Sequence, residues 1–372
     1  MSIIKKLNIF TKYLIFLLFA AIMIDLIINL IVPEKLKKQI GTTKNYSLKS
    51  KKFHHELAAN INLPEFWGKK KYQVITNEFG MRVGDNYKLD KKKKNIGFMG
   101  DSFIYGSGID YSDHFINFLS KKNQSYNFLN LGYVGYSPSI YFKKIEYYIE
   151  KININFKTIF LFIDTSDIQD EGIFYREDKH GNIVRKWNSD KKNEIKNLKY
   201  TFKNYLKQNS FIFKFYDIIS SKTVNENQLR CLNKTEKIEN FITFLDYERF
   251  GYGSNFEIQK KKWVKEGQLK TLKYLKKIKN LLNDKNIELI LVYYPSAIEV
   301  LEGKKNFKNN SHFKILNKWA SENNIDFINS SNDFFTSPSS IDNYINNHIK
   351  CDVHWNVNGH KIIAKNILPS LN

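Results

Sequence analysis

The stretch Asn95–Gly108, NIGFMGDSFIYGSG, places Ser102 directly after a short apolar run and before a glycine-rich bend. Such a bend either cradles a phosphate with its backbone N–H groups or presents the serine hydroxyl as a nucleophile. A Walker-type phosphate loop needs a lysine after its second glycine, and a dinucleotide-binding turn needs three glycines that open a helix. Gly100–Gly108 has neither pattern, so the nucleophile is favoured.

A nucleophilic serine needs a base and an acid that orients the base. Near the other end of the chain lies Lys350–His360, KCDVHWNVNGH, in which Asp352 precedes His354 by two residues. His354 can take the serine proton while Asp352 holds the imidazole ring and stabilises the charge that develops. The alternative is that His354 only packs against the last helix.

The elements that must position these residues are strands and helices in alternation. Strands are predicted at 96–99, 126–131, 158–163, 287–294 and 325–328, and helices at 112–122, 139–151, 261–283, 311–322 and 358–368. Strands separated by helices predict an α/β fold with three α/β/α layers and a central parallel sheet. Segments that follow the carboxyl ends of such strands meet at one edge of the sheet, so the last loop can bring its Asp and His to Ser102.

The predicted domain spans residues 93–372 and contains a mostly helical insertion at about 171–260, where the alternation stops. Residues 33–92 are predicted to be an irregular juxtamembrane segment, apart from an extended piece at 74–85. The large aromatic residues of the insertion suggest either a lid or sugar-stacking surface or ordinary packing, and they include Tyr175, Trp187 and Phe211.

The N-terminal part carries a long apolar segment. Tyr13–Val32, YLIFLLFAAIMIDLIINLIV, is about as long as a helix needs to be to cross a bilayer, and no clear cleavage site follows it. Asp25 costs about 2.5–3.5 kcal/mol at the centre of a membrane helix, which the many apolar neighbours offset. We predict an uncleaved membrane anchor at 13–32 after a cytoplasmic tail at 1–12, with a buried core helix as the alternative. Lysines on both sides leave the orientation open.

The net charge of +22 arises from lysines that are spread along the chain. No zinc-finger, RNP-type or other nucleic-acid motif accompanies them, so a solvated basic surface is favoured over nucleic-acid binding.

Two cysteines, Cys231 and Cys351, are too few for a disulfide scaffold and leave their pairing open. Cys351 lies close to His348, His354 and His360, but these residues lack the tight pairs that are usual in zinc sites. We therefore predict no metal and no cofactor.

Four blocks of sequence, in this order, resemble the SGNH/GDSL hydrolase superfamily. They are GDSF after the first strand, NLGYVGYS (Asn130–Ser137) after the second, FIDTSD (Phe162–Asp167) after the third, and DVHWNVNGH near the end. The resemblance covers about residues 75–167 and 287–368. It implies a flavodoxin-like fold that hydrolyses or transfers O-acyl groups through a serine acyl-enzyme. The short Asp-x-His-Trp form is similar to that of membrane-associated acyltransferases and esterases that act on exported polysaccharides.

The resemblance also implies roles for individual residues. Ser102 would be the nucleophile, His354 the base and Asp352 its partner. The backbone amides of Ser102 and of either Gly132 or Gly135 would form the oxyanion hole.

One position departs from the family pattern. The third block usually carries an asparagine that donates to the oxyanion, and Ser166 occupies its place. Because removing one such donor costs about 2.7–4 kcal/mol of barrier, either Ser166 substitutes, another group such as Asn130 helps, or the enzyme is slow. The acidic residues around it suggest either a cation or cationic substrate group, or acids that complement a helix dipole, and they are Asp164, Asp167, Asp170 and Glu171.

Together these features predict a membrane-anchored SGNH-like domain, periplasmic or extracellular, that acts on acylated carbohydrate or another O-acyl ester. One alternative is a catalytically inactive domain of this fold that binds polysaccharide or scaffolds an export complex. A second is a protein that binds a membrane surface or nucleic acid through its positive charge. The acyl group, the acceptor and the balance of hydrolysis and transfer stay open.

Overall fold

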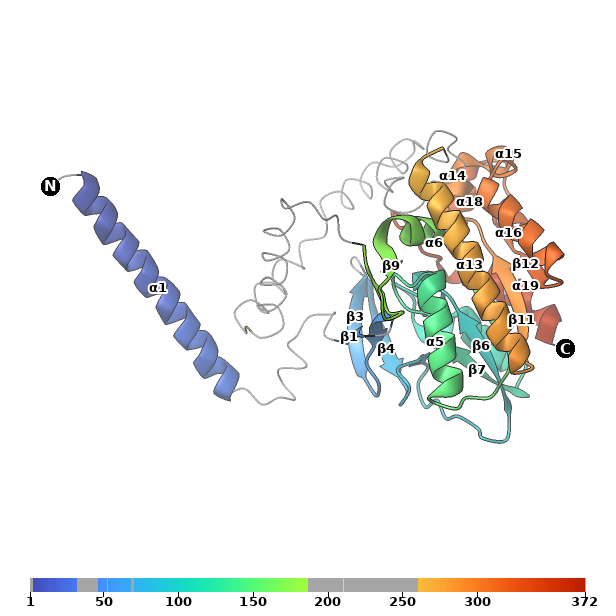
Figure 1. The fold of residues 1–372 in the computed structure, drawn as a ribbon, viewed down its shortest axis with the longest axis horizontal. Coiled ribbons are helices and arrows are strands. Elements are labelled where there is room, and N and C mark those ends of the chain that lie inside the picture. Colours follow the sequence, from blue (N-terminus) through green and yellow to red (C-terminus); the bar gives the residue numbers. More distant parts are fainter. Residues whose placement is uncertain are drawn as a thin grey trace. The chain divides into compact units, whose positions relative to one another are not determined.

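The computed structural model describes residues 3–31, 46–51, 53–67, 70–186, 210 and 260–371. The described residues fall into two compact units. Helix α1 (Ile3–Ile31) belongs to one of them, and residues 47–186 and 260–371 belong to the other, which carries the sheet (Figure 1).

Helix α1 contains most of the predicted apolar segment. Across the described part of the chain, no helix is both long enough and apolar enough to span a bilayer. The predicted membrane anchor at 13–32 is therefore not supported.

The core of the second unit is an eight-stranded sheet in the order β12-β11-β8-β6-β7-β5-β4-β3. Its first five strands are parallel. Numbered along the chain, these five stand in the order 2-1-3-4-5, counted from β7, which is the flavodoxin-like arrangement. They are β6 (Lys94–Met99), β7 (Tyr126–Asn130), β8 (Phe156–Ile163), β11 (Glu288–Tyr293) and β12 (Asp326–Asn329).

The sheet is mixed rather than wholly parallel, because three strands from residues 62–83 extend it beyond β7 in antiparallel pairing. They are β3 (Asn62–Trp67), β4 (Lys70–Thr76) and β5 (Arg82–Val83). Along β4, Tyr72, Val74 and Thr76 are buried in alternation, as expected of a strand with one face on the core. Pro64 lies in β3, at the edge of the sheet, where a missing N–H is tolerated. This segment was predicted to be irregular outside 74–85.

A helix of eight or more residues lies in each of the four connections between successive parallel strands, and α19 (Val357–Ile367) follows the last strand. The chain steps from β6 to β7 in one direction and from β7 to β8 in the other, so right-handed crossovers put α4 on one face and α5 on the opposite face. Helix α13 packs beside α5 (Figure 1), and α19 packs against α4. The helices are α4 (Phe115–Lys122), α5 (Pro138–Glu150), α13 (Lys262–Asp284), α16 (Ser311–Glu322) and α19 (Val357–Ile367).

Shorter elements complete the unit. Strands β1 (Ser47–Ser50) and β2 (His54–Leu57) form a separate hairpin, as do β9 (Tyr175–Glu177) and β10 (Ile183–Arg185). The short helices are α3 (Ser102–Tyr105), η1 (Tyr111–Asp113), α6 (Thr165–Gln169), η2 (Asp170–Phe174), α14 (Ala297–Glu302), α15 (Lys304–Phe307), α17 (Ser331–Phe334), α18 (Ser340–Asn347) and η3 (Leu368–Leu371).

The described part of the predicted helical insertion at 171–260 consists mainly of the end of η2 and the β9–β10 hairpin. Most of the rest of it, with Trp187 and Phe211, lies outside the described residues.

Candidate active site

Ser102 is the first residue of α3, immediately beyond the carboxyl end of β6. The Asp101 side chain accepts a hydrogen bond of 2.9 Å from Phe103 N–H and so starts the helix. A Cβ at Gly100 would lie 2.2 Å from Ile104 Cγ1, so only glycine lets the chain turn this tightly. Gly106, with φ of 83°, ends the helix in the left-handed region. The serine is therefore held on a sharp turn between a buried strand and one helical turn.

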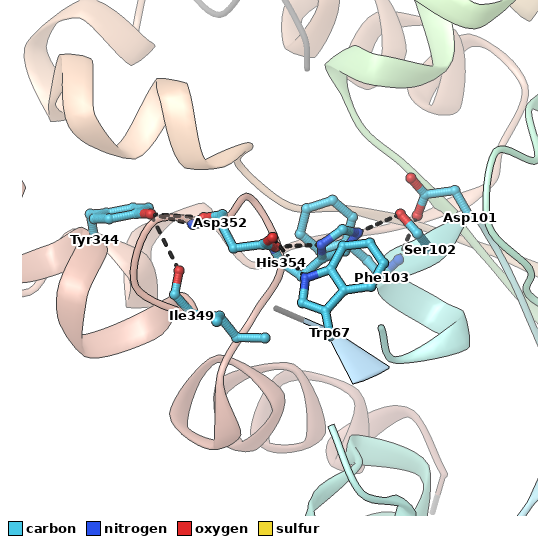
Figure 2. Close-up of polar contacts among 8 residues, drawn as sticks. All are labelled: Trp67, Asp101, Ser102, Phe103, Tyr344, Ile349, Asp352 and His354. Atoms are coloured by element: carbon cyan, nitrogen blue, oxygen red, sulfur yellow. Dashed lines mark hydrogen bonds and ion pairs between the residues drawn. The ribbon is translucent and has the colours of Figure 1, made fainter. Parts of the chain in front are cut away.

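A chain of hydrogen bonds joins Ser102, His354 and Asp352 (Figure 2). His354 Nε2 lies 2.8 Å from Ser102 Oγ, and His354 Nδ1 lies 2.5 Å from Asp352 Oδ1. A carboxylate only accepts, so Nδ1 of the ring carries the hydrogen and Nε2 is left to accept the serine proton. The sequence-predicted serine, histidine and aspartate are thus brought together in the geometry of a base-activated nucleophile.

Asp352 is fixed by two residues that the sequence analysis missed (Figure 2). Trp67 Nε1–H, at the end of β3, donates to Asp352 Oδ2 over 2.7 Å. The Tyr344 hydroxyl donates to the backbone carbonyl of Asp352 over 2.8 Å and accepts from its N–H over 3.0 Å. The Trp67 ring also stands edge-on to the His354 ring at 4.9 Å between centroids. Together these contacts hold both the carboxylate and the loop that carries it.

The loop itself is compact. Ile349 N–H donates to the His354 carbonyl over 2.8 Å, which closes the loop around Asp352. Cys351 is buried, has φ of 59° and is disulfide-bonded. Cys231, the other cysteine of the chain, lies outside the described residues.

Two backbone N–H groups beside the serine have no acceptor among the described residues, those of Ser102 and Gly135. The parallel ladder of β6 and β7 continues past the strands, with Leu131 N–H donating to the Phe98 carbonyl and Tyr133 N–H to that of Gly100. Each of these hydrogen bonds lies two residues further along both segments, so the next pair in the ladder would be Gly135 and Ser102. Gly135 has φ of 72°, so the backbone leaves the extended conformation there. The ladder ends, and the Gly135 N–H does not join it.

The other predicted oxyanion donors are already engaged. Gly132 N–H donates to Asn130 Oδ1 over 3.0 Å, and Asn130 Nδ2 donates to the Ile104 carbonyl over 2.7 Å. The Ser166 hydroxyl donates to Asp164 Oδ1 over 2.6 Å. Gly132 and Asn130 therefore fasten the loop to α3, and Ser166 helps to cap α6.

The acidic loop after β8 consists of buried carboxyl groups. Asp164 is the N-cap of α6 and forms a reciprocal capping box with Asp167, as expected of acids that complement a helix N-terminus. Asp164 Oδ2 is buried without a hydrogen-bond partner among the described residues. Burial raises the pKa of both groups, and neighbouring carboxyl groups raise it further, Asp101 for Asp164 and Asp164 for Asp167.

These groups make stability depend on pH. Burial raises the pKa of six carboxyl groups, which are Asp101, Asp164, Asp167, Asp170, Glu171 and Glu299, the last to about 7. Above about pH 5 the native state holds protons that the unfolded chain has released, so the free energy of unfolding falls as pH rises. The slope is about 1.4 kcal/mol per pH unit for each carboxyl that stays protonated.

Two kinds of group have the opposite effect on stability and so limit the pH range in which the trend can be measured. Buried histidines oppose the trend mainly below about pH 6.5, and Lys144, whose pKa burial lowers to about 8, opposes it at higher pH. Urea unfolding should therefore give lower stability at pH 8 than at pH 7, and Asp164→Asn should flatten the slope while exposed Asp90→Asn should not. A stability that rises over this interval would contradict the prediction.

The remaining histidines near the C-terminus have separate surroundings. His360 Nδ1 accepts from Phe115 N–H at 3.4 Å, and His348 stacks on Tyr344. Within the described residues, no group of three His, Cys, Asp or Glu side chains is arranged to hold a metal ion.

No protein-family model and no curated protein match the chain. Among solved structures, an acetyl xylan esterase covers 75% of this chain and 100% of its own, with 13% identity and a TM-score of 0.41. A GDSL-like lipase from Bacteroides thetaiotaomicron covers 77% and 91%, with 12% identity and a TM-score of 0.37. A lipase/acylhydrolase from Enterococcus faecalis covers 75% and 95%, with 8% identity and a TM-score of 0.38.

The chain is similar to the SGNH/GDSL acylhydrolases. At these identities and TM-scores the matches say nothing about the activity of this chain.

Proposed function

We propose that this SGNH/GDSL-like domain is a serine-dependent ester hydrolase or acyltransferase that works through an acyl-enzyme. The observation that carries the proposal is the hydrogen-bonded chain from Ser102 Oγ through His354 to Asp352, in which the carboxylate engages Nδ1 and leaves Nε2 facing the serine. Two backbone N–H groups beside the serine, for which the described part of the chain offers no acceptor, support it, because an oxyanion hole requires such donors.

In the first half of the reaction Ser102 Oγ attacks the carbonyl carbon of the ester, and its proton passes to His354 Nε2. Asp352 stabilises the imidazolium through Nδ1–H. The negative charge on the carbonyl oxygen is met by the N–H groups of Ser102 and Gly135. The C–O bond to the alcohol then breaks, and His354 returns the proton to the leaving oxygen.

In the second half a water molecule or a sugar hydroxyl attacks the acyl-enzyme. His354 takes its proton, the bond to Ser102 Oγ breaks, and the serine is protonated again. Water gives hydrolysis and a sugar hydroxyl gives transfer. The proposed substrate is an acylated cell-envelope polysaccharide or a related O-acyl ester, as the resemblance of the Asp-x-His-Trp block implies.

We place the domain outside the cytoplasm. The disulfide of Cys351 supports this, because disulfides persist in oxidising compartments and are rare in the cytosol.

The test is labelling by a serine-directed fluorophosphonate together with hydrolysis of p-nitrophenyl acetate. We expect wild type to be labelled on Ser102 and to turn over the ester, and Ser102→Ala to lose both. Ser107→Ala, a buried serine of the same loop, is the matched control and should keep both. Labelling that persists in Ser102→Ala would refute the assignment of the nucleophile.

A catalytically inactive, polysaccharide-binding domain is the second candidate. The observation that favours it is the engagement of the Ser166 hydroxyl by Asp164, which leaves the oxyanion without the donor that the family's asparagine supplies. Wild type that is folded but neither labelled nor active would support this candidate.

A further inference from the structure

Two hairpins outside the parallel sheet hold the loop that carries Gly135. His55 of β2 contacts the Val134 carbonyl through Nε2 at 2.7 Å. The Tyr175 hydroxyl of β9 donates to the Gly135 carbonyl over 2.8 Å. The carbonyls of the two peptides that flank the Gly135 Cα are thus fixed by side chains from distant parts of the sequence.

The contacts of His55 determine its protonation. A carbonyl only accepts, so His55 Nε2 carries a hydrogen and donates it to Val134. Burial lowers the pKa of His55 to about 4, so the ring is neutral at neutral pH and its Nδ1 accepts. His54 Nδ1 lies 2.8 Å from His55 Nδ1 and must be the donor of that contact. The two imidazoles therefore form a directed relay from His54 through His55 to the Val134 carbonyl.

The backbone at His54 is itself unusual. Its φ of 70° lies in the left-handed region, which costs a residue other than glycine about 1–3 kcal/mol and is concentrated at functional sites. His54 also packs edge-on against Tyr175 at 5.3 Å between ring centroids, so the relay and the tyrosine form one cluster.

Resting on the proposed function, we propose that His55, oriented by His54, is a positioning residue of the oxyanion hole. In a planar trans peptide the C=O of Val134 and the N–H of Gly135 point in opposite directions. Holding the carbonyl towards His55 therefore turns the Gly135 N–H the other way, towards the ester oxygen at Ser102. Tyr175 fixes the following peptide and keeps the glycine from rotating.

The experiment compares His55→Phe, which keeps an aromatic ring without a donor, with His55→Gln, whose amide can still donate to Val134. Because loss of an oxyanion donor costs about 10²–10³ in kcat, loosening one is expected to lower kcat of His55→Phe at least about tenfold. KM for p-nitrophenyl acetate should change less than about twofold, and the rate of fluorophosphonate labelling should fall with kcat. His55→Gln should recover most of the loss.

Two further variants complete the set. His180→Phe, an exposed histidine near the β9–β10 turn, is the matched control and should behave as wild type. Tyr175→Phe removes a single hydroxyl, so it tests the same peptide even if His55→Phe fails to fold. Its kcat should fall at unchanged KM.

The outcomes separate the two proposals. Folded His55→Phe and Tyr175→Phe with wild-type kcat, or His55→Gln as impaired as His55→Phe, would overturn the positioning role while leaving Ser102 as the nucleophile. Wild type no more active than Ser102→Ala would overturn the proposed function and this inference together.

Discussion

Replacing Asp352 by asparagine is expected to lower kcat about 10³–10⁴-fold without unfolding the protein, as loss of the acid does in Ser-His-Asp triads. Oδ1 of Asp352 accepts from the backbone N–H and the ring Nδ1–H of His354, and Oδ2 accepts from Trp67. An amide has one accepting oxygen, so its NH₂ must face one of these donors. If the NH₂ faces His354, it donates to Nδ1, and the ring hydrogen then lies on Nε2. A protonated Nε2 can no longer accept the proton of Ser102.

The other orientation of the asparagine loses the Trp67 hydrogen bond and still removes the charge that stabilises the imidazolium. Asp342→Asn, an exposed substitution in α18, is the matched control and should retain wild-type kcat. The measurement is p-nitrophenyl acetate hydrolysis over a range of pH, with circular dichroism as the check on folding. A loss of less than about tenfold would show that Asp352 does not orient the base.

The largest effect on stability is expected for Arg82→Met. The Arg82 side chain is fully buried on β5 and donates to the carbonyls of Tyr105 at 2.8 Å, Gly106 at 2.6 Å and Ile109. Its guanidinium also lies over the rings of Tyr72 and Tyr105. Methionine fills similar space without any donor, so three carbonyls in the turn after α3 lose the hydrogen bonds from Arg82, although that of Gly106 still accepts from Ile109 N–H at 3.3 Å. Because an unsatisfied buried acceptor costs about 1–3 kcal/mol and the Gly106 carbonyl keeps one donor, we expect a total loss of about 3–5 kcal/mol.

Urea unfolding measures this loss, and Arg176→Met, on the exposed side of β9, is the matched control. Arg82→Lys should fall between wild type and Arg82→Met, because an ammonium lacks the planar fork that serves several carbonyls at once. Equal stability of wild type and Arg82→Met would show that the turn after Ser102 finds other donors.

The parallel part of the fold was predictable because apolar runs, longest in β8 and β11, alternate with helical segments. The segment predicted at 158–163 lies within β8, and the predicted helix at 311–322 matches α16. Apart from the extended piece at 74–85, which overlaps the end of β4 and β5, the antiparallel strands were missed because β3 and β4 mix polar residues and lysines with their apolar ones. They belong to the sheet only because β3 pairs with β4, β4 with β5 and β5 with β7, and pairing between strands has no local signature in the sequence.

The candidate site was predictable where a local motif marks the residue, as the Gly-Asp-Ser turn marks Ser102 and the Asp-x-His spacing marks Asp352 and His354. Trp67 could not be found, because it meets Asp352 only after β3 has joined the far edge of the sheet. The choice between Gly132 and Gly135 also depended on tertiary contacts. The Asn130 side chain accepts from the Gly132 N–H, and no sequence motif indicates the direction in which that side chain points.

The hydrogen bond from Ser102 to His354 joins residues 252 positions apart. Closing so long a loop is entropically costly and slow, and contacts of this separation form late in folding. Until the loop that carries His354 reaches the end of β6, Ser102 therefore lacks the ring nitrogen that would accept its proton. On the proposed function, a chain whose C-terminal loop has not yet docked cannot activate Ser102, so a nascent or truncated chain would not acylate itself on esters that it meets before folding is complete.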